Sequence, residues 1–158
     1  MSFIIGVDPG ASGAVAILER DGQLVHVFEM PSVELIVNNK AKRRISPEML
    51  AADLRLYAVK ATIAYVEQVN AMPNQGVTSM FAFGQAFGIV QGVLAGLAIP
   101  AQLVPPGKWK KWHNLSPSKD ASRAKAAAIW PDMAGEFRRV KDDGKAEAAL
   151  IAHWGLHA

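Results

Sequence analysis

Four carboxylate side chains occupy positions in the sequence from which they could share one site. Asp8 follows the apolar run FIIGV and precedes a Pro-Gly turn, and Glu67 ends a second, β-branched run, TIAYV. Asp143 and Glu147 are four residues apart, so they share one face of a predicted C-terminal helix. If the two strands are neighbours and this helix crosses the sheet beside them, all four acids converge.

Carboxylates gathered at one point repel one another, and two that share a site normally force one pKa upward. Divalent cations would keep the group ionised. Because the predicted donors are oxygens, with no His or Cys among them, Mg²⁺ or Mn²⁺ is favoured over zinc. Two such ions about 4 Å apart can activate a water and stabilise the leaving oxygen in phosphodiester hydrolysis. The four acids therefore predict metal-dependent cleavage of a nucleic-acid backbone.

Each acid also has a purely structural interpretation. Asp8 could cap the turn that follows it, and Glu67 could be a surface residue at a strand end. Asp142 and Asp143 would be favourable at a helix N-terminus in any case, and Glu147 could pair with an exposed lysine. Against these interpretations, the helix continues as AALIAHW, which is apolar and predicts burial.

The elements that must position the acids form a predicted mixed α/β domain. Strands are expected over 3–8, 13–19, 23–30, 62–69 and 101–106, and helices over 47–60, 78–97, 118–130 and 142–154. The first three strands follow one another through short turns and should be antiparallel, whereas the later ones alternate with helices and should join in parallel. Residues 31–46 are polar and basic and predict an irregular, mobile loop, 107–115 predict a short helix or a loop, and Gly155 is expected to stop the last helix.

Composition indicates one folded domain over 1–158. Hydrophobic residues make up 51% of the chain, which is enough for a core and argues against disorder. The absence of cysteine excludes disulfides, thiolate zinc sites and cysteine nucleophiles, and it suits a reducing cytoplasm. The N-terminus lacks signal-peptide features, and the apolar run 88–100 is too short and glycine-rich to span a bilayer. A cytoplasmic protein without membrane association is therefore predicted.

The net charge of +3 is small, but the basic residues are clustered, around 40–44, 108–111, 119–125 and 138–141. Such patches suit a polyanion such as nucleic acid, although solvated surface faces would produce the same pattern. A helix over 78–97 would place Gly84, Gly88, Gly92 and Gly96 on one face, which permits close approach of another backbone.

Three segments in this order, FIIGVDPGASGAVAIL, YVEQVNAMPNQGVTSMFAFGQAFG and DDGKAEAALIAHWG, resemble the RuvC-like Holliday-junction resolvases, most closely the short forms of phages, prophages and organelles. The resemblance covers nearly the whole chain. It implies a ribonuclease H-like fold with a mixed five-stranded sheet flanked by helices. It also implies a homodimer that nicks two opposed strands of a four-way DNA junction in recombination and repair, leaving 5′-phosphate ends, in a bacterial or phage-infected cell.

The same resemblance implies the site residues. The catalytic metal site, with Mg²⁺ or Mn²⁺ and two ions per site, would comprise Asp8, Glu67, Asp143 and Glu147. In the common bacterial pattern the last acid is preceded by another acid or a histidine three residues earlier, where this chain has Gly144. The shorter branch is similar to the present arrangement, so Asp143 is assigned the role, and Asp142 either substitutes for it or points to solvent.

The bacterial enzymes also have an aromatic residue three positions after the strand-end glutamate, where it stacks on a junction base; this chain has Asn70. Met72, Phe81 and Phe83 are the predicted replacements, although both phenylalanines could instead pack in the core or in a dimer. The basic residues predicted to contact DNA are Lys108, Lys119, Arg123, Arg43 and Arg44. Trp109 and Trp112 are expected to pack the loop rather than stack on DNA.

Two other functions are compatible with this pattern. One is a ribonuclease H-like nuclease that acts on RNA or on other branched DNA. The other is a junction-binding protein that does not cut, which the loss of one of the acids would indicate. All four acids are present in the chain, so cleavage is the favoured interpretation.

Overall fold

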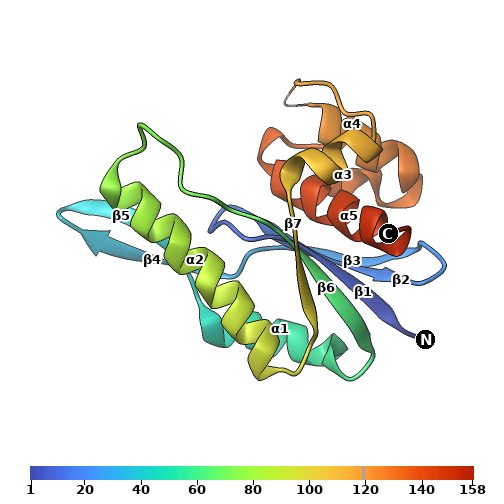
Figure 1. The fold of residues 1–158 in the computed structure, drawn as a ribbon, viewed down its shortest axis with the longest axis horizontal. Helices are drawn as coiled ribbons and strands as arrows, with labels where there is room; N and C mark the ends of the chain where they lie inside the picture. Colours follow the sequence, from blue (N-terminus) through green and yellow to red (C-terminus); the bar gives the residue numbers. More distant parts are fainter. Residues whose placement is uncertain (119) are drawn as a thin grey trace.

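A five-stranded sheet forms the centre of the structure, a computed structural model that describes residues 1–118 and 120–158 (Figure 1). Its strands are β1 (Phe3–Asp8), β2 (Ala14–Glu19), β3 (Leu24–Glu29), β6 (Ala61–Glu67) and β7 (Ala101–Val104). The order across the sheet is β3-β2-β1-β6-β7. β1, β2 and β3 pair antiparallel, whereas β1–β6 and β6–β7 are parallel. The predicted mixed sheet and its strand directions are therefore confirmed.

Helices cover both faces of the sheet (Figure 1). α1 (Pro47–Ala58) and α2 (Val77–Gly96) lie over one face, and α5 (Asp143–Leu156) lies over the other, backed by α4 (Ala121–Ile129). Alternation along β1 separates two cores: Ile5 and Val7 pack with α1 and α2, whereas Ile4 packs with α5. Both faces of β1 are therefore buried, and its polar side chain, Asp8, stands where the strand ends.

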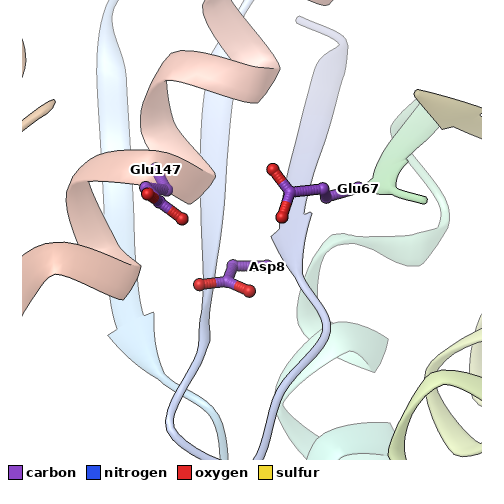
Figure 2. A group of neighbouring side chains, drawn as sticks. All are labelled: Asp8, Glu67 and Glu147. Carbon is purple, nitrogen blue, oxygen red and sulfur yellow. The ribbon is translucent and has the colours of Figure 1, made fainter. Parts of the chain in front are cut away.

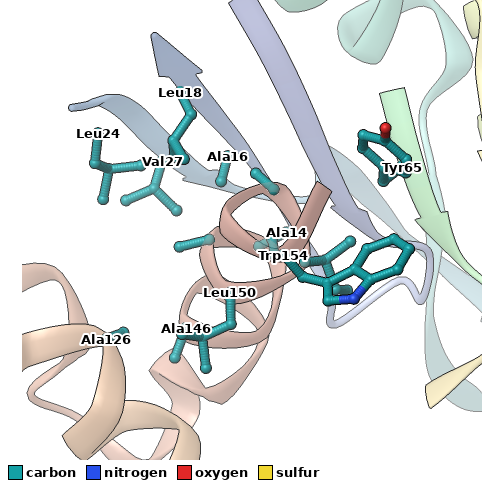
Figure 3. Packing of buried hydrophobic residues seen from close by; sticks show 14 of the residues in the cluster. Ala14, Ala16, Leu18, Leu24, Val27, Tyr65, Ala126, Ala146, Leu150 and Trp154 are labelled. Carbon is teal, nitrogen blue, oxygen red and sulfur yellow. The ribbon is translucent and has the colours of Figure 1, made fainter. Parts of the chain in front are cut away.

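Small residues let α5 lie directly on the sheet. Leu150 and Trp154 of the helix pack against Ala14 and Ala16 of β2 (Figure 3). A Cβ atom at Gly6 of β1 would lie 2.1 Å from a carbonyl oxygen of α5, so only glycine fits at this position. This close approach brings the N-terminal part of α5 beside the end of β1.

The predicted end of α5 at Gly155 is wrong, because the helix continues to Leu156. A Cβ atom at Gly155 would lie 2.2 Å from the ring of Tyr65 in β6. Here glycine serves the packing of helix on sheet. It does not take the left-handed conformation by which glycine commonly ends a helix.

The irregular loop predicted for 31–46 is also wrong. These residues form a two-stranded hairpin, β4 (Ser32–Val37) and β5 (Lys40–Ile45), with six paired positions. Asn38 and Asn39 at its tip both have positive φ, 51° and 59°, as a two-residue hairpin turn requires. The hairpin extends away from the main sheet beside the N-terminal half of α2 (Figure 1). Only β5, KAKRRI, is basic, whereas β4, SVELIV, is largely apolar and β-branched and so carries a strand signal in the sequence.

Shorter elements connect β7 to α5. They are α3 (Pro106–Trp112), α4, and the 3₁₀ helices η1 (Pro131–Phe137) and η2 (Val140–Asp142). The region left open between a short helix and a loop is thus helical. At the start of α1, Ser46 caps the helix, because its Oγ accepts a hydrogen bond from the backbone N–H of Met49.

α2 is, by length and composition alone, long and apolar enough to cross a membrane, and only 17% of its most apolar window is buried. One side of the helix, which carries Val90 and Leu94, packs into the core beneath it. The predicted glycine face is on the open side: a Cβ atom at Gly84, Gly88 or Gly92 would meet no atom within 4 Å among the described residues. The helix therefore presents a flat, apolar, unpartnered surface.

Candidate metal centre

Three carboxylates from three different elements meet where β1 ends. Asp8 ends β1, Glu67 ends β6 and Glu147 lies in the second turn of α5. One carboxylate oxygen of each lies within 4.8 Å of one from each of the others, and Figure 2 shows the three side chains turned toward a common space. β1 and β6 are parallel neighbours, so their carboxyl ends bring Asp8 and Glu67 to the same edge. The structure thus brings together three of the four predicted acids.

Burial raises the pKa values of all three acids, and repulsion from neighbouring carboxylates raises those of Asp8 and Glu147 further. The pKa of Asp8 rises to about 7, first because burial penalises its anion and then because Glu147 and Glu67 lie near; a backbone hydrogen bond with Gly10 opposes this. Burial likewise raises the pKa of Glu147 to about 7, against the opposing charge of Lys110. Burial also raises the pKa of Glu67. A divalent cation would relieve this repulsion, and a set of three carboxylates suits Mg²⁺ or Mn²⁺.

The fourth predicted acid, Asp143, lies outside this group. Its Oδ1 accepts a hydrogen bond of 3.0 Å from Nε of Arg123 in α4. Asp142 does not point to solvent, which corrects that alternative: its side chain is only 1% exposed and accepts hydrogen bonds from the backbone N–H and the guanidinium of Arg139. This pairing lowers the pKa of Asp142, mainly through the hydrogen bond from the Arg139 side chain.

Packing explains why no acid stands three residues before Glu147. A Cβ atom at Gly144 would lie 2.9 Å from the carbonyl oxygen of Ser12 and 3.1 Å from the backbone of Gly13. The N-terminus of α5 therefore rests on the loop that follows β1, and a side chain at position 144 would push the two apart. The neighbouring position 143 has space for its acid, which pairs with α4.

α3 brings two further side chains to the carboxylates. Trp109 is fully buried, and its Nε1–H donates a hydrogen bond of 2.8 Å to Oε2 of Glu67. Nζ of Lys110 lies 3.9 Å from Oε1 of Glu147. Lys108, which the sequence predicts to contact DNA, has its Nζ 5.8 Å from the ring centroid of Trp154.

The other residues that the sequence predicts to contact DNA differ in how exposed they are. The Arg123 side chain is only 14% exposed and also donates to the carbonyl oxygen of Arg138. Lys119 lies outside the described residues. Met72 and Phe81 are exposed, Phe81 on the open side of α2. The DNA contacts made by these residues stay predictions.

A cavity of about 440 Å³ lies beside Asp8, between the loop that follows β1, β5 and α2. Arg43 and Arg44 line it from the hairpin, and Phe83 lines it from α2. A second cavity of about 300 Å³ lies between the same loop and the N-terminus of α5, next to Asp143. The first cavity thus borders Asp8 and the second borders Asp143, and the Arg43 side chain lines both.

Comparisons with known proteins agree with this geometry. No family model matches the chain. Over 100 residues, 62% of this chain, it is 33% identical to Holliday junction resolvase MOC1, chloroplastic, of Chlamydomonas reinhardtii, and the match spans 11% of that relative's length. The structure of T. thermophilus RuvC in complex with Holliday junction substrate is similar with a TM-score of 0.58 at 14% identity, over 98% of this chain and 95% of that one. This likeness shows that the chain has the RuvC fold, which is ribonuclease H-like.

Proposed function

We propose that this protein is a metal-dependent endodeoxyribonuclease that resolves four-way DNA junctions by paired symmetric nicks. The observation that supports this most directly is the convergence of Asp8, Glu67 and Glu147 within 4.8 Å on a RuvC fold. A local match to a protein named a Holliday junction resolvase favours a junction over other nucleic acids. Because that match spans a small part of the relative, the activity of the whole chain is an inference.

Asp8, Glu67 and Glu147 would hold Mg²⁺ or Mn²⁺, and Asp143 is the proposed further ligand for a second ion. When bound, such ions supply an activated water and stabilise the charge that develops on the leaving oxygen. The elements that carry the three carboxylates hold them rigidly, because two stand at the ends of neighbouring strands and the third on a helix packed against those strands. The products would carry 5′-phosphate and 3′-hydroxyl ends.

Lys110 is the cation best placed to meet the scissile phosphate. Its ammonium group lies beside Glu147, and its charge opposes the rise in the pKa of Asp8, Glu67 and Glu147. If Asp8, Glu67 and Glu147 held metal ions, the Lys110 ammonium would be available to a phosphate oxygen at the same place. Lys110 would therefore stabilise negative charge that increases as the phosphodiester bond breaks.

The β4–β5 hairpin is the proposed binding surface for one arm of the DNA junction. It carries four cations, Lys40, Lys42, Arg43 and Arg44, and among the described residues none of them forms an ion pair with a carboxylate. Free cations beside a cavity that reaches Asp8 suit a phosphate backbone leading to the cut. Lys108 and Lys119 are proposed to extend this contact on the side of α3 and α4.

A base-stacking side chain is proposed at the same cavity. Of the candidates Met72, Phe81 and Phe83, only Phe83 lines the cavity beside Asp8. An exposed aromatic ring can stack on an unpaired base, which contributes about 1–3 kcal/mol. Phe81 lies on the other side of α2, where a second copy of the chain is the better partner.

A homodimer would form through the open side of α2. Two symmetric cuts require two centres related by a two-fold axis, so the interface must be self-complementary. The glycine face of α2 is apolar, flat and unpartnered in the described part of the chain, so it allows two helices to approach closely. A cytoplasmic location, in bacteria or phage-infected cells, stays a prediction from the sequence.

The decisive experiment measures cleavage of a mobile four-way junction with Mg²⁺ beside linear duplex DNA, an RNA–DNA hybrid and RNA. We expect the junction alone to be nicked, symmetrically, and Asp8→Asn to abolish cutting while junction binding persists. Asp132→Asn is the matched control, because Asp132 is exposed and lies in η1, away from the three carboxylates. Equal cleavage of the hybrid would indicate a different ribonuclease H-like nuclease, and binding without cleavage would indicate a non-cutting junction protein.

A further inference from the structure

We propose that Trp109 is a positioning residue, which holds the carboxylate of Glu67 in the orientation that binds a divalent cation. This inference rests on the proposed function, because it assigns Glu67 to the metal centre. It concerns the contact between an indole on α3 and an acid at the end of β6, which are 42 residues apart in the chain.

The contact restricts Glu67 to one orientation. The indole N–H is a donor with no acceptor capacity, and Trp109 is fully buried, so its hydrogen bond of 2.8 Å to Oε2 of Glu67 satisfies a donor that would otherwise be unpaired. Within the part of the chain that the structure describes, Oε1 of Glu67 accepts no protein hydrogen bond. One oxygen is thus tied to α3, and the other is free for a cation.

The helix that carries Trp109 is itself fixed to α5. Nε2 of His113, the residue that ends α3, makes a hydrogen bond of 2.9 Å with the carbonyl oxygen of Leu150 in α5. The Trp112 ring stacks on that of His157 with centroids 5.2 Å apart. α3 is therefore a bridge between two metal-binding acids: it reaches Glu67 through Trp109 and is anchored on the helix that carries Glu147.

A packing role alone does not account for this arrangement. The acceptor that this indole meets is a carboxylate, and it is one of the three acids of the centre. Hydrogen bonds to ionised acceptors are about twice as strong as neutral ones, so the contact stabilises the charged, cation-binding form of Glu67. Partners that orient a metal ligand in this way typically change metal affinity by about 10–100-fold when they are removed.

The test measures Mn²⁺ affinity of the full-length protein, by electron paramagnetic resonance or calorimetry. Trp109→Phe removes the N–H and keeps an aromatic ring, and we expect Mn²⁺ affinity to fall by about 10–100-fold. Trp130→Phe is the matched control: it is the same substitution and likewise removes an indole hydrogen bond, of 2.9 Å, but the acceptor is the carbonyl oxygen of Gly22 and not one of the three acids. Mn²⁺ affinity of that variant should equal that of the wild type.

A double-mutant cycle separates positioning from general loss of structure. If Trp109 acts through Glu67, Trp109→Phe should cost no further affinity in a Glu67→Gln background. An equal loss in both backgrounds would overturn the inference, as would wild-type Mn²⁺ affinity in Trp109→Phe. In junction cleavage, Trp109→Phe should lower kcat with KM for the junction nearly unchanged, because the DNA contacts lie elsewhere.

A second variant covers the case in which the phenylalanine substitution unfolds the protein. Replacing Trp109 with 3-benzothienylalanine puts sulfur in place of the N–H at nearly the same shape. We expect the same loss of Mn²⁺ affinity, and undiminished affinity in this variant would overturn the inference. Failure of the wild type to bind Mn²⁺ would instead overturn the proposed function, so the two failures are distinguishable.

Discussion

Nε of Arg123 in α4 donates a hydrogen bond of 3.0 Å to Oδ1 of Asp143. This contact holds Asp143, the fourth acid, against a guanidinium and apart from the three carboxylates that converge. Asp143 stands at the N-terminal end of α5, one turn before Glu147. Three carboxylates therefore converge at this centre, and the fourth is held beside them by Arg123. The four acids should not be equivalent in binding the first cation.

Substitutions at the two α5 acids test this difference. Glu147→Gln should lower Mn²⁺ affinity by more than tenfold, because it removes one of the three converging oxygens. Asp143→Asn should lower it by a few-fold at most, because the carboxylate it removes is already paired with Arg123. Titration of each variant with Mn²⁺ measures both values. Equal losses would show that Asp143 joins the first-bound cation and that Arg123 releases it.

The raised pKa of Asp8 predicts how the metal-free protein depends on pH. The pKa is about 7 in the folded chain, against 3.8 for a free aspartate, so the folded state favours the protonated acid. The stability that this group contributes is fully present below about pH 4 and is lost as pH rises through about 7. Asp8→Asn removes the charge, so it should raise the melting temperature at pH 8 by several degrees and have a smaller effect at pH 5.

Thermal denaturation in the presence of a chelator measures this difference. Addition of Mg²⁺ should raise the melting temperature of the wild type at pH 8 and leave that of Asp8→Asn nearly unchanged, because the cation substitutes for the missing proton. Asp132→Asn again serves as the control, with the wild-type response expected at both pH values. If Asp8→Asn were no more stable than the wild type at pH 8, burial of this charge would be less costly than its pKa indicates.

The acids could be predicted from the sequence because each follows a local signal. Asp8 and Glu67 stand where apolar, β-branched runs end, and parallel pairing then brings strand ends together. Glu147 stands on a helix whose apolar composition predicts burial. These signals require only the periods of strands and helices, so they are readable without knowledge of tertiary contacts.

Trp109 and Lys110 could not be predicted as site residues for the opposite reason. The bond from Trp109 to Glu67 spans 42 residues, and no local spacing encodes it. Gly155 shows the same limit, because a helix-stop residue by composition is instead the contact point for the ring of Tyr65. In the β4–β5 hairpin only the basic β5 resembles a loop; the apolar, β-branched β4, SVELIV, and the paired asparagines at the tip are the signals of a hairpin in the sequence.

The salt dependence of junction affinity tests whether the β4–β5 hairpin binds DNA. Each phosphate contact contributes about 0.9 to the slope of log K against log salt. Lys42→Ala with Arg43→Ala should lower that slope by about 2, so the loss of junction affinity should be larger at low salt than at high salt. Lys60→Ala is the control, because Lys60 lies next to Phe3, the first residue of β1, whereas Asp8 is at the other end of that strand.

Fluorescence anisotropy with a labelled junction measures these slopes. The hairpin should tolerate both substitutions, since neither side chain forms an ion pair among the described residues and both strands keep their backbone pairing. Circular dichroism would check that the fold is intact. An unchanged slope would indicate that the hairpin does not contact the phosphates and that the basic residues of α3 and α4 bind the DNA instead.

The open face of α2 gives the last prediction, in which stability and association change in opposite directions. A Cβ atom at Gly88 would meet no described atom within 4 Å in the single chain, and replacing glycine in a helix interior stabilises it by up to about 1 kcal/mol. Gly88→Leu should therefore raise the thermal stability of the monomer. If two α2 helices pack on one another through this face, the same side chain blocks their approach and dissociates the dimer.

Analytical ultracentrifugation of the wild type, Gly88→Ala and Gly88→Leu measures this association. We expect the dimer to weaken in that order, because the smaller methyl group permits a closer approach than the leucine side chain. Symmetric cutting of the junction should become uncoupled single nicking in Gly88→Leu, since one centre then acts alone. A Gly88→Leu dimer as tight as the wild type would place the two-fold interface elsewhere, and the exposed apolar face of α2 would need a different partner.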